Sequence, residues 1–258
     1  MESGARRVQE QYSRQAQYYS ISRTHATGDT LSLLLEWGQP EPAFRVLDIA
    51  TGTGFTAFTF APHVAQVVAY DLTQEMLREA VKLAGERDLA NLQYVQGLAE
   101  RLPFPDATFD LVTCRTAPHH FDSIPDFVRE ARRVTRPGGR VLVADTSSPE
   151  DPELFRWMNH VEKLRDPSHV ENRTPEEWRQ VFAAAGLVVE ALDTEHRVAL
   201  VFSDWVRRSG TPPEVVEELR RLYRTASRSA QDAFEIRPLE DGDFTFSWMI
   251  TVLAGRRP

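Results

Sequence analysis

The sequence has a single cysteine, Cys114, among its 258 residues. One thiol excludes an intrachain disulfide and suits a reducing compartment. Because Cys114 ends an apolar run, we expect a buried core thiol and not a nucleophile. The sequence also lacks the roughly 18 consecutive apolar residues of a membrane span and the apolar N-terminal stretch of a signal peptide. These absences predict a cytoplasmic protein without a membrane span.

Positive charge is scarce as well. The chain has 30 Lys and Arg against 38 Asp and Glu, a formal net charge of −8. An acidic protein repels phosphate backbones, and the arginine pairs at 207–208, 220–221 and 256–257 are too short to offset this. Each pair lies among Glu or Pro, which is typical of a solvated helix face or tail. We therefore expect no nucleic-acid partner.

Short apolar runs alternate with helical patterns over the first 145 residues. The residues at 73–87 and 124–134 have the spacing of amphipathic helices. This alternation predicts a mostly parallel sheet covered on both faces. The expected strands of this part are residues 45–49, 66–71, 92–96, 109–114 and 140–145.

The pattern changes after the fifth strand. A polar helix is expected at 150–166, and a second at 174–186 because Thr174 and Glu177 form a capping box around Pro175. A sixth strand at 187–192, a charged helical stretch at 203–233 and a long terminal strand at 244–254 follow.

We expect one domain with appended segments. Residues 1–41 form a helical lid, 42–146 the core, 147–183 and 198–240 helical insertions that cap the substrate, and 184–197 and 241–258 the last strands of the core. The insertions follow the fifth and sixth strands, so they cover the crevice at the carboxyl ends of the strands.

Four N-terminal side chains could close this crevice, or they could simply pack as the side chains of amphipathic helices do: Tyr12, Tyr18, Tyr19 and His25. The aromatic and histidine residues of the insertions could line an apolar site or fill a core: Trp157, His160, His169, Trp178, Trp205 and Tyr223.

A glycine-rich loop follows the first strand. Gly52 and Gly54 permit a tight turn and let a ligand approach the backbone. Asp48 ends the strand just before the loop, where a carboxylate could receive an ammonium group, a cation that an NAD site does not need to bind. Asp71 closes the second strand about 20 residues later, where a carboxylate meets the ribose hydroxyls of an adenosine. An N-cap or a solvated strand end is the other interpretation of Asp71.

Two adjacent histidines follow the fourth strand. His119 or His120 could act as a general base, because imidazole titrates near neutral pH. The alternative is that one ring packs against the cofactor and the other caps the next helix. No carboxylate at ligand spacing accompanies them, so we expect no metal site.

Five segments occur in a characteristic order: residues 48–54 (DIATGTG), Asp71, residues 97–104 (GLAERLPF), residues 109–112 (FDLV) and residues 136–140 (RPGGR). Together they resemble class I S-adenosyl-L-methionine (SAM)-dependent methyltransferases of the ubiquinone/menaquinone-biosynthesis-like group. The resemblance spans residues 12–145. Residues 164–169 and the C-terminal strands are similar to an uncharacterised bacterial branch of the group.

The resemblance implies an α/β fold. The expected architecture is a Rossmann-like seven-stranded sheet, order 3-2-1-4-5-7-6, with the last strand antiparallel, helices on both faces and a helical cap.

SAM is the implied cofactor. Gly52 and Gly54 would flank its methionine part, Asp71 would hold the ribose, and Leu72 and Met76 would cover the adenine. The family usually has Asp at position 98, accepting from the adenine amino group, whereas this chain has Leu98; the backbone N–H of Ala99 would still bond a ring nitrogen. The complete expected cofactor set is Tyr19, Asp48, Ala50, Gly52, Thr53, Gly54, Asp71, Leu72, Met76, Leu98, Ala99, Glu100 and Arg115.

The expected function is methyl transfer from SAM to a small molecule through an oxygen, nitrogen or carbon nucleophile, with aromatic or quinone-like acceptors among the candidates, by a monomer or homodimer. One alternative is an NAD-dependent oxidoreductase, which shares the loop and Asp71 but leaves Asp48 and residues 97–104 unexplained. The other is a SAM-binding protein without methyl-transfer activity, a hypothesis that only Leu98 favours.

Overall fold

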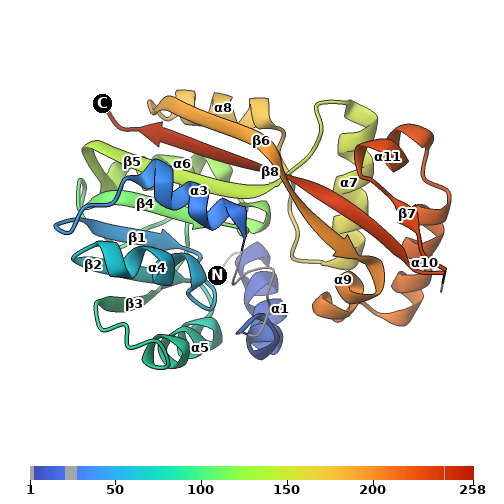
Figure 1. Cartoon of the computed structure of the whole chain (residues 1–258), viewed down its shortest axis with the longest axis horizontal. Coiled ribbons are helices and arrows are strands. Elements are labelled where there is room, and N and C mark those ends of the chain that lie inside the picture. Colours follow the sequence, from blue (N-terminus) through green and yellow to red (C-terminus); the bar gives the residue numbers. More distant parts are fainter. Residues whose placement is uncertain (1–2, 21–27, 241) are drawn as a thin grey trace.

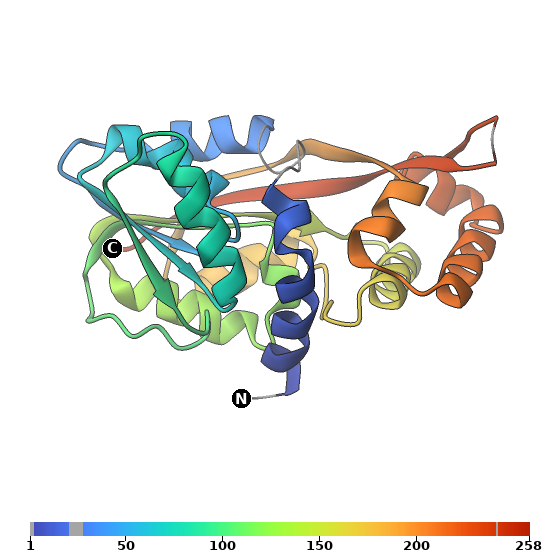
Figure 2. The same ribbon diagram turned by 90° about the horizontal axis from the view of Figure 1, so that it is seen from below.

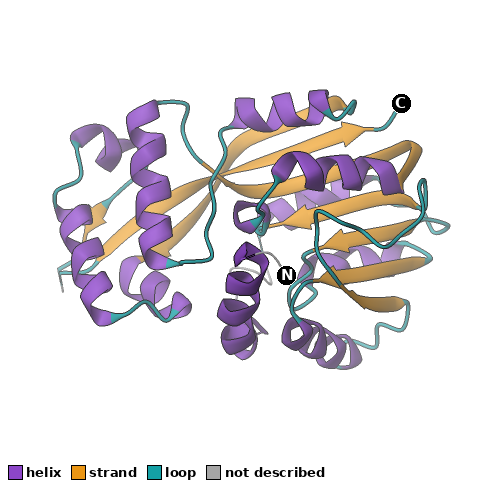
Figure 3. Cartoon of the chain, turned by 180° about the vertical axis from the view of Figure 1, so that it is seen from behind, coloured by secondary structure: helices purple, strands orange, loops and turns teal. Residues whose placement is uncertain are grey.

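The fold is a twisted central β-sheet with helices on both faces (Figures 1 and 3). The computed structural model describes residues 3–20, 28–240 and 242–258, apart from the side chains at positions 3 and 14–20. The strands are β1 (Arg45–Ile49), β2 (Gln66–Asp71), β3 (Leu92–Gln96), β4 (Phe109–Arg115), β5 (Thr135–Ser147), β6 (Val188–Val201), β7 (Arg237–Pro238) and β8 (Phe244–Arg256).

The strand order confirms the Rossmann-like prediction. The order is β3-β2-β1-β4-β5-β8-β6, with the short β7 paired to β8 outside this path. The pairs among β1 to β5 are parallel, and β8 is antiparallel to both β5 and β6. β7, which the sequence pattern did not predict, adds one two-residue strand to the expected seven.

The core strands are apolar on both faces because helices cover both. Val46, Leu47 and Ile49 of β1 are completely buried, as expected of a central parallel strand. On one face lie α3 (Asp29–Gly38), α4 (Phe55–Phe60) and α5 (Gln74–Gly85), and on the other α6 (Ile124–Val134) and α8 (Pro175–Ala184). Two short 3₁₀ turns, η1 (Ala61–His63) and η2 (Pro118–His120), complete this part.

β6 and β8 continue beyond the sheet and carry a second hydrophobic core (Figure 1). Around them pack α7 (Pro152–Arg165), α9 (Phe202–Ser209), α10 (Pro213–Arg224) and α11 (Arg228–Ala233). We call this group the cap. Its centre is aromatic: Trp205, Tyr223, Phe234, Phe246 and Trp248 are all almost completely buried.

Helix α1 (Ser3–Ser20) lies between the sheet and the cap (Figure 2). The Gln9 side chain donates to the carbonyl of Leu72, 2.9 Å away, at the end of β2. The Gln11 side chain donates to the carbonyl of Ser209 in the cap, 2.8 Å away. α1 therefore connects the two parts of the molecule.

Three local details differ from the sequence pattern. The helical stretch expected at 203–233 is three helices, because Gly210, with φ of 65°, ends α9 in the left-handed region and Ser227 caps α11. β5 begins at Thr135 instead of Arg140. His25 and the side chains of Tyr18 and Tyr19 lie outside the described part of the chain.

Candidate functional site

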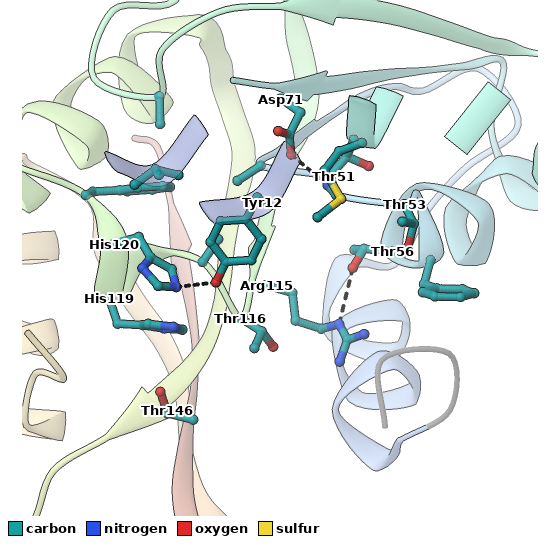
Figure 4. A pocket seen from close by; sticks show the side chains of 18 of the residues that line it. Tyr12, Thr51, Thr53, Thr56, Asp71, Arg115, Thr116, His119, His120 and Thr146 are labelled. Atoms are coloured by element: carbon teal, nitrogen blue, oxygen red, sulfur yellow. Dashed lines mark hydrogen bonds between the residues drawn. The ribbon is translucent and has the colours of Figure 1, made fainter. Parts of the chain in front are cut away.

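A cavity of about 450 Å³ lies at the carboxyl ends of the core strands, between α1 and the cap. This is the crevice where open α/β sheets bind ligands. Figure 4 shows side chains from several strand ends and from α1 converging on it. Of the residues predicted from the sequence, twelve line it: Ala50, Gly52, Thr53, Asp71, Leu72, Met76, Leu98, Ala99, Glu100, Arg115, His119 and His120.

The two loop glycines are required for different reasons. A Cβ added to Gly52, which has φ of 55°, would meet no protein atom within 4 Å, because the position faces the cavity. A Cβ added to Gly54, with φ of 95°, would collide with the Phe58 ring. Gly52 therefore leaves space for a ligand, whereas Gly54, which does not line the cavity, lets α4 begin close to the loop.

Asp48, which was predicted to receive an ammonium group, is not among the residues that line the cavity. Its side chain is completely buried, and its two oxygens accept from the hydroxyls of Thr51 at 2.6 Å and Thr113 at 2.7 Å. Burial raises the pKa of Asp48 to about 6, although both hydrogen bonds favour the charged form. Asp48 thus holds the glycine loop and β4 together beneath the site.

Asp71 does line the cavity and organises the loop above it. Its oxygens accept from the backbone N–H groups of Gly52 and Thr73, each at 2.8 Å. Burial raises the pKa of this carboxyl to about 6. A carboxylate has about four lone-pair positions, so Asp71 retains the capacity to accept from a ligand hydroxyl.

Residues 97–100 form the adjacent wall. The Tyr70 hydroxyl donates to the carbonyl of Leu98 at 3.0 Å and so fixes the backbone there. Glu100 Oε1 accepts from the backbone of Asp122 at 2.9 Å, while Glu100 Oε2 is buried without a hydrogen-bond partner among the described residues. Burial raises the pKa of Glu100. The segment is thus held on both sides, by β2 and by the loop before α6.

Arg115 supplies a buried positive charge at the end of β4. Its Nε donates to the Thr56 hydroxyl at 3.3 Å, at the start of α4 (Figure 4). Burial lowers the pKa of Arg115 to about 10, against the charge of Asp48, which raises it. The guanidinium therefore remains cationic at neutral pH and suits an anionic group of a ligand.

The two histidines of η2 have different partners. His119 Nδ1 lies 2.7 Å from Asp145 Oδ1, and the His119 backbone N–H donates to Asp145 Oδ2 at 2.8 Å. His120 Nε2 lies 2.6 Å from the Tyr12 hydroxyl, and its Nδ1 lies 3.2 Å from the Ser168 hydroxyl. The rings lie 4.1 Å apart, centre to centre.

Sequence reasoning missed Asp145 and Ser168. Asp145 lies near the carboxyl end of β5, at the same edge of the sheet as Asp48 and Asp71, and this position was an available signal. Ser168 lies in the loop after α7, and nothing in the sequence indicates that this loop packs on His120.

The far wall of the cavity belongs to the cap and combines apolar side chains with charged ones. Trp205 is the one insertion aromatic or histidine named above that lines it, since Trp157, Trp178 and Tyr223 pack in the hydrophobic cores. The remaining cap-side residues include Val198, Leu200, Trp248 and Ile250, together with Glu162, Arg165 and Arg208. In the described part of the chain, no group of three or more His, Cys, Asp or Glu residues has a metal-binding arrangement, and no helix is long and apolar enough to cross a membrane.

Comparisons with known proteins give a consistent result. Residues 47–143 match the family model described as a methyltransferase domain. The chain is 37% identical over 231 residues to the uncharacterized methyltransferase YcgJ of Bacillus subtilis, covering 90% of this chain and 91% of that protein. The crystal structure of YcgJ superposes with a TM-score of 0.82 at 36% identity, covering 89% of this chain and 98% of that one. The ubiquinone/menaquinone biosynthesis C-methyltransferase UbiE of Paracoccus denitrificans is 36% identical over 154 residues, 57% of this chain and 61% of that protein.

Proposed function

Because the chain belongs to the class I SAM-dependent methyltransferases, in the same group as YcgJ and UbiE, we propose that it transfers the methyl group of SAM to a small molecule. SAM is the cofactor. The acceptor provides an oxygen, nitrogen or carbon nucleophile. The NAD-dependent oxidoreductase is not favoured, because the relatives named above are methyltransferases.

We place SAM along the wall formed by the glycine loop and β2. The ribose hydroxyls would donate to Asp71, and the adenine would lie between Met76 and Leu98, bonded to the N–H of Ala99. The methionine part would follow residues 50–53, with its carboxylate near Arg115. These residues line one continuous cavity, which is the observation that supports the placement. Tyr19 remains a proposed contact whose side chain is outside the described part.

The acceptor would occupy the opposite, cap-side half of the same cavity. The apolar part of this wall, which includes Trp205, Trp248 and Ile250, suits an aromatic or similarly apolar molecule. Ala5, Val8 and Tyr12 of α1 line the cavity as well, so we propose that α1 is its lid and that the insertions at 147–183 and 198–240 form the substrate cap. A cavity enclosed in this way supports a small-molecule acceptor.

Methyl transfer from a sulfonium ion is an in-line displacement, in which the protein mainly aligns the nucleophile and excludes water. A cavity enclosed by the sheet, α1 and the cap serves both purposes. We further propose that the protein acts in the cytoplasm, a location that its single, buried and free cysteine suits, and that it does so as a monomer or homodimer.

The test uses SAM with an isotopic label in the transferred methyl group. The protein is incubated with this SAM and, separately, with the small-molecule, protein and nucleic-acid fractions of a bacterial lysate. We expect label to enter a product of the small-molecule fraction only. Label in protein or nucleic acid would contradict the proposed acceptor class, and a tightly bound but unreacted SAM in all fractions would favour a binding protein without transfer activity.

A further inference from the structure

The His119–Asp145 pair has the geometry of an oriented base, and His120 does not. Both Asp145 oxygens accept from His119, one from the backbone N–H and one from the ring. A carboxylate partner fixes Nδ1 as the protonated nitrogen. Nε2 is then the nitrogen with a free lone pair.

The Nε2 atom of His119 is available to a ligand. The one hydrogen bond of the His119 ring with a described residue is made by Nδ1, and His119 lines the cavity. Figure 4 shows the His119 ring pointing toward the same space as the side chains of Thr116 and Thr146. The lone pair therefore faces the site where the acceptor would lie.

His120 has both ring nitrogens engaged. The Ser168 hydroxyl donates to Asp166 at 2.6 Å, so Ser168 accepts from His120 Nδ1–H, and Nε2 must accept from the Tyr12 hydroxyl. Burial, and the neighbouring His119, lower the pKa of His120 to about 3. His120 is thus a neutral ring that joins α1 to the loop after α7.

Burial alone would lower the pKa of His119, but the charge and the hydrogen bond of Asp145 outweigh it and raise that pKa above its usual value. A base with a pKa near the working pH combines basicity with a useful fraction of the deprotonated form. The charged or titratable groups that face His119 are Asp145 on β5, His120 on η2, Glu162 and Arg165 on α7, and His169 in the loop after α7.

We propose that His119 is the general base of the methyl transfer, that Asp145 is its positioning residue, and that the acceptor is an acidic hydroxyl compound, a phenol or an enol. This inference rests on the proposed function. A neutral amine could attack through its lone pair before losing a proton, whereas a phenol is a weak nucleophile until its proton is removed. An oriented base beside an aromatic wall therefore fits a phenol or enol better than an amine.

The step balances as follows in atoms and electrons. His119 Nε2 takes the hydroxyl proton, and the oxygen, or the carbon conjugated with it, forms a bond to the methyl carbon. The carbon–sulfur bond breaks and its electron pair stays on sulfur, which gives neutral S-adenosylhomocysteine. The imidazolium returns its proton to solvent after the product leaves.

The first test compares kcat on the product-forming acceptor isolated with labelled SAM. We expect His119→Gln to lower kcat by about 100- to 10,000-fold, with the affinity for S-adenosylhomocysteine changed by less than about threefold. His160→Gln, the same change on an exposed position of α7, is the matched control.

Asp145→Asn should shift the midpoint of the pH–rate profile to lower pH, whereas His120→Gln should leave that midpoint in place. A His119→Gln enzyme with kcat within about threefold of the wild type would overturn the assignment while the proposed function stands. If the wild type forms no methylated product, the proposed function fails, and the base with it.

A second measurement needs neither an acceptor nor a variant. Nitrogen-15 NMR of the wild-type protein should show neutral His119 with its proton on Nδ1, and a pKa above about 6.5, the usual histidine value. A ring protonated on Nε2 when neutral, or a pKa below that value, would overturn the proposal even if methyl transfer is observed.

Discussion

Two carboxyl groups hold the glycine loop in place, and their burial lowers the free energy of unfolding at neutral pH. Asp48 and Asp71 both have a pKa raised to about 6 by burial. A group whose pKa is raised in the folded state adds stability that is fully present below the unfolded pKa and disappears as the pH rises through the folded pKa. For Asp48 the loss therefore extends from about pH 4 to beyond pH 6.

Asp48→Asn should reverse this loss. One of the two hydroxyls of Thr51 and Thr113 can rotate to accept from the amide NH2 while the other continues to donate to the amide oxygen, so both contacts survive without a buried charge. We expect the variant to be more stable than the wild type by about 1–3 kcal/mol at pH 8 and equal to it at pH 4, as measured by urea unfolding. Asp232→Asn, on an exposed position of α11, is the control and should show no such pH dependence. Lower stability of Asp48→Asn at pH 8 would show that the ionised carboxylate is stabilised in place.

At the residue level, the order of strands and loops along the chain predicted which residues lie at the site. It did not predict which atoms their side chains contact. Gly52 and Asp71 were predicted to lie at the cavity because the carboxyl ends of neighbouring parallel strands meet there, and both do. Asp48 occupies the same edge, yet its side chain points beneath the loop to Thr51 and Thr113. The side on which a strand-end residue lies depends on pleat and packing, which a single sequence does not specify.

Among the elements, α1 has the largest influence on access to the cavity. Gln9 contacts the end of β2 and Ser13 donates to Glu75 of α5 at 2.9 Å. Gln11 and Tyr12 bond to the cap and to His120. A polar helix held by side-chain hydrogen bonds can open at a lower free energy than the core.

Tyr12→Phe should loosen this helix. The change leaves His120 Nε2 buried without a donor, which costs about 1–3 kcal/mol. We expect faster hydrogen exchange in α1, with α6 unchanged, and weaker binding of S-adenosylhomocysteine. Tyr94→Phe is the matched control, since the hydroxyl of Tyr94 on β3 makes only a 3.5 Å bond to the carbonyl of Ala80 in α5. Unchanged exchange in α1 would mean that the Tyr12 hydroxyl does not hold the lid.

The sequence pattern predicted the seven principal strands because each is an apolar or alternating run between turn signals. It did not predict β7, or the length of β6, which continues from Val188 to Val201. The part of β6 that follows residue 192 is half exposed and includes Asp193 and His196, so its composition resembles a loop. Its strand conformation comes from pairing with β8, a tertiary effect that local propensity does not contain.

At the scale of the whole molecule, the sheet and the cap have separate hydrophobic cores, and the cavity lies where they meet. Under the proposed function, the cofactor lies against the wall of the sheet and the acceptor against the wall of the cap. The cofactor side derives from the strand ends of the sheet, whose motifs the sequence displays. The acceptor side derives from the cap, where Trp205 and Trp248 come from α9 and β8 and meet only through the fold.

The central claim, that this cavity is the SAM site and that Asp71 holds the ribose, is tested most directly by calorimetry with S-adenosylhomocysteine. The wild type and the control Asp232→Ala should bind it with equal affinity, and neither should bind NADH. Asp71→Ala should lose at least about 100-fold, since two hydrogen bonds to a charged acceptor contribute roughly 3 kcal/mol or more together. Equal affinity of Asp71→Ala and the wild type would contradict the account.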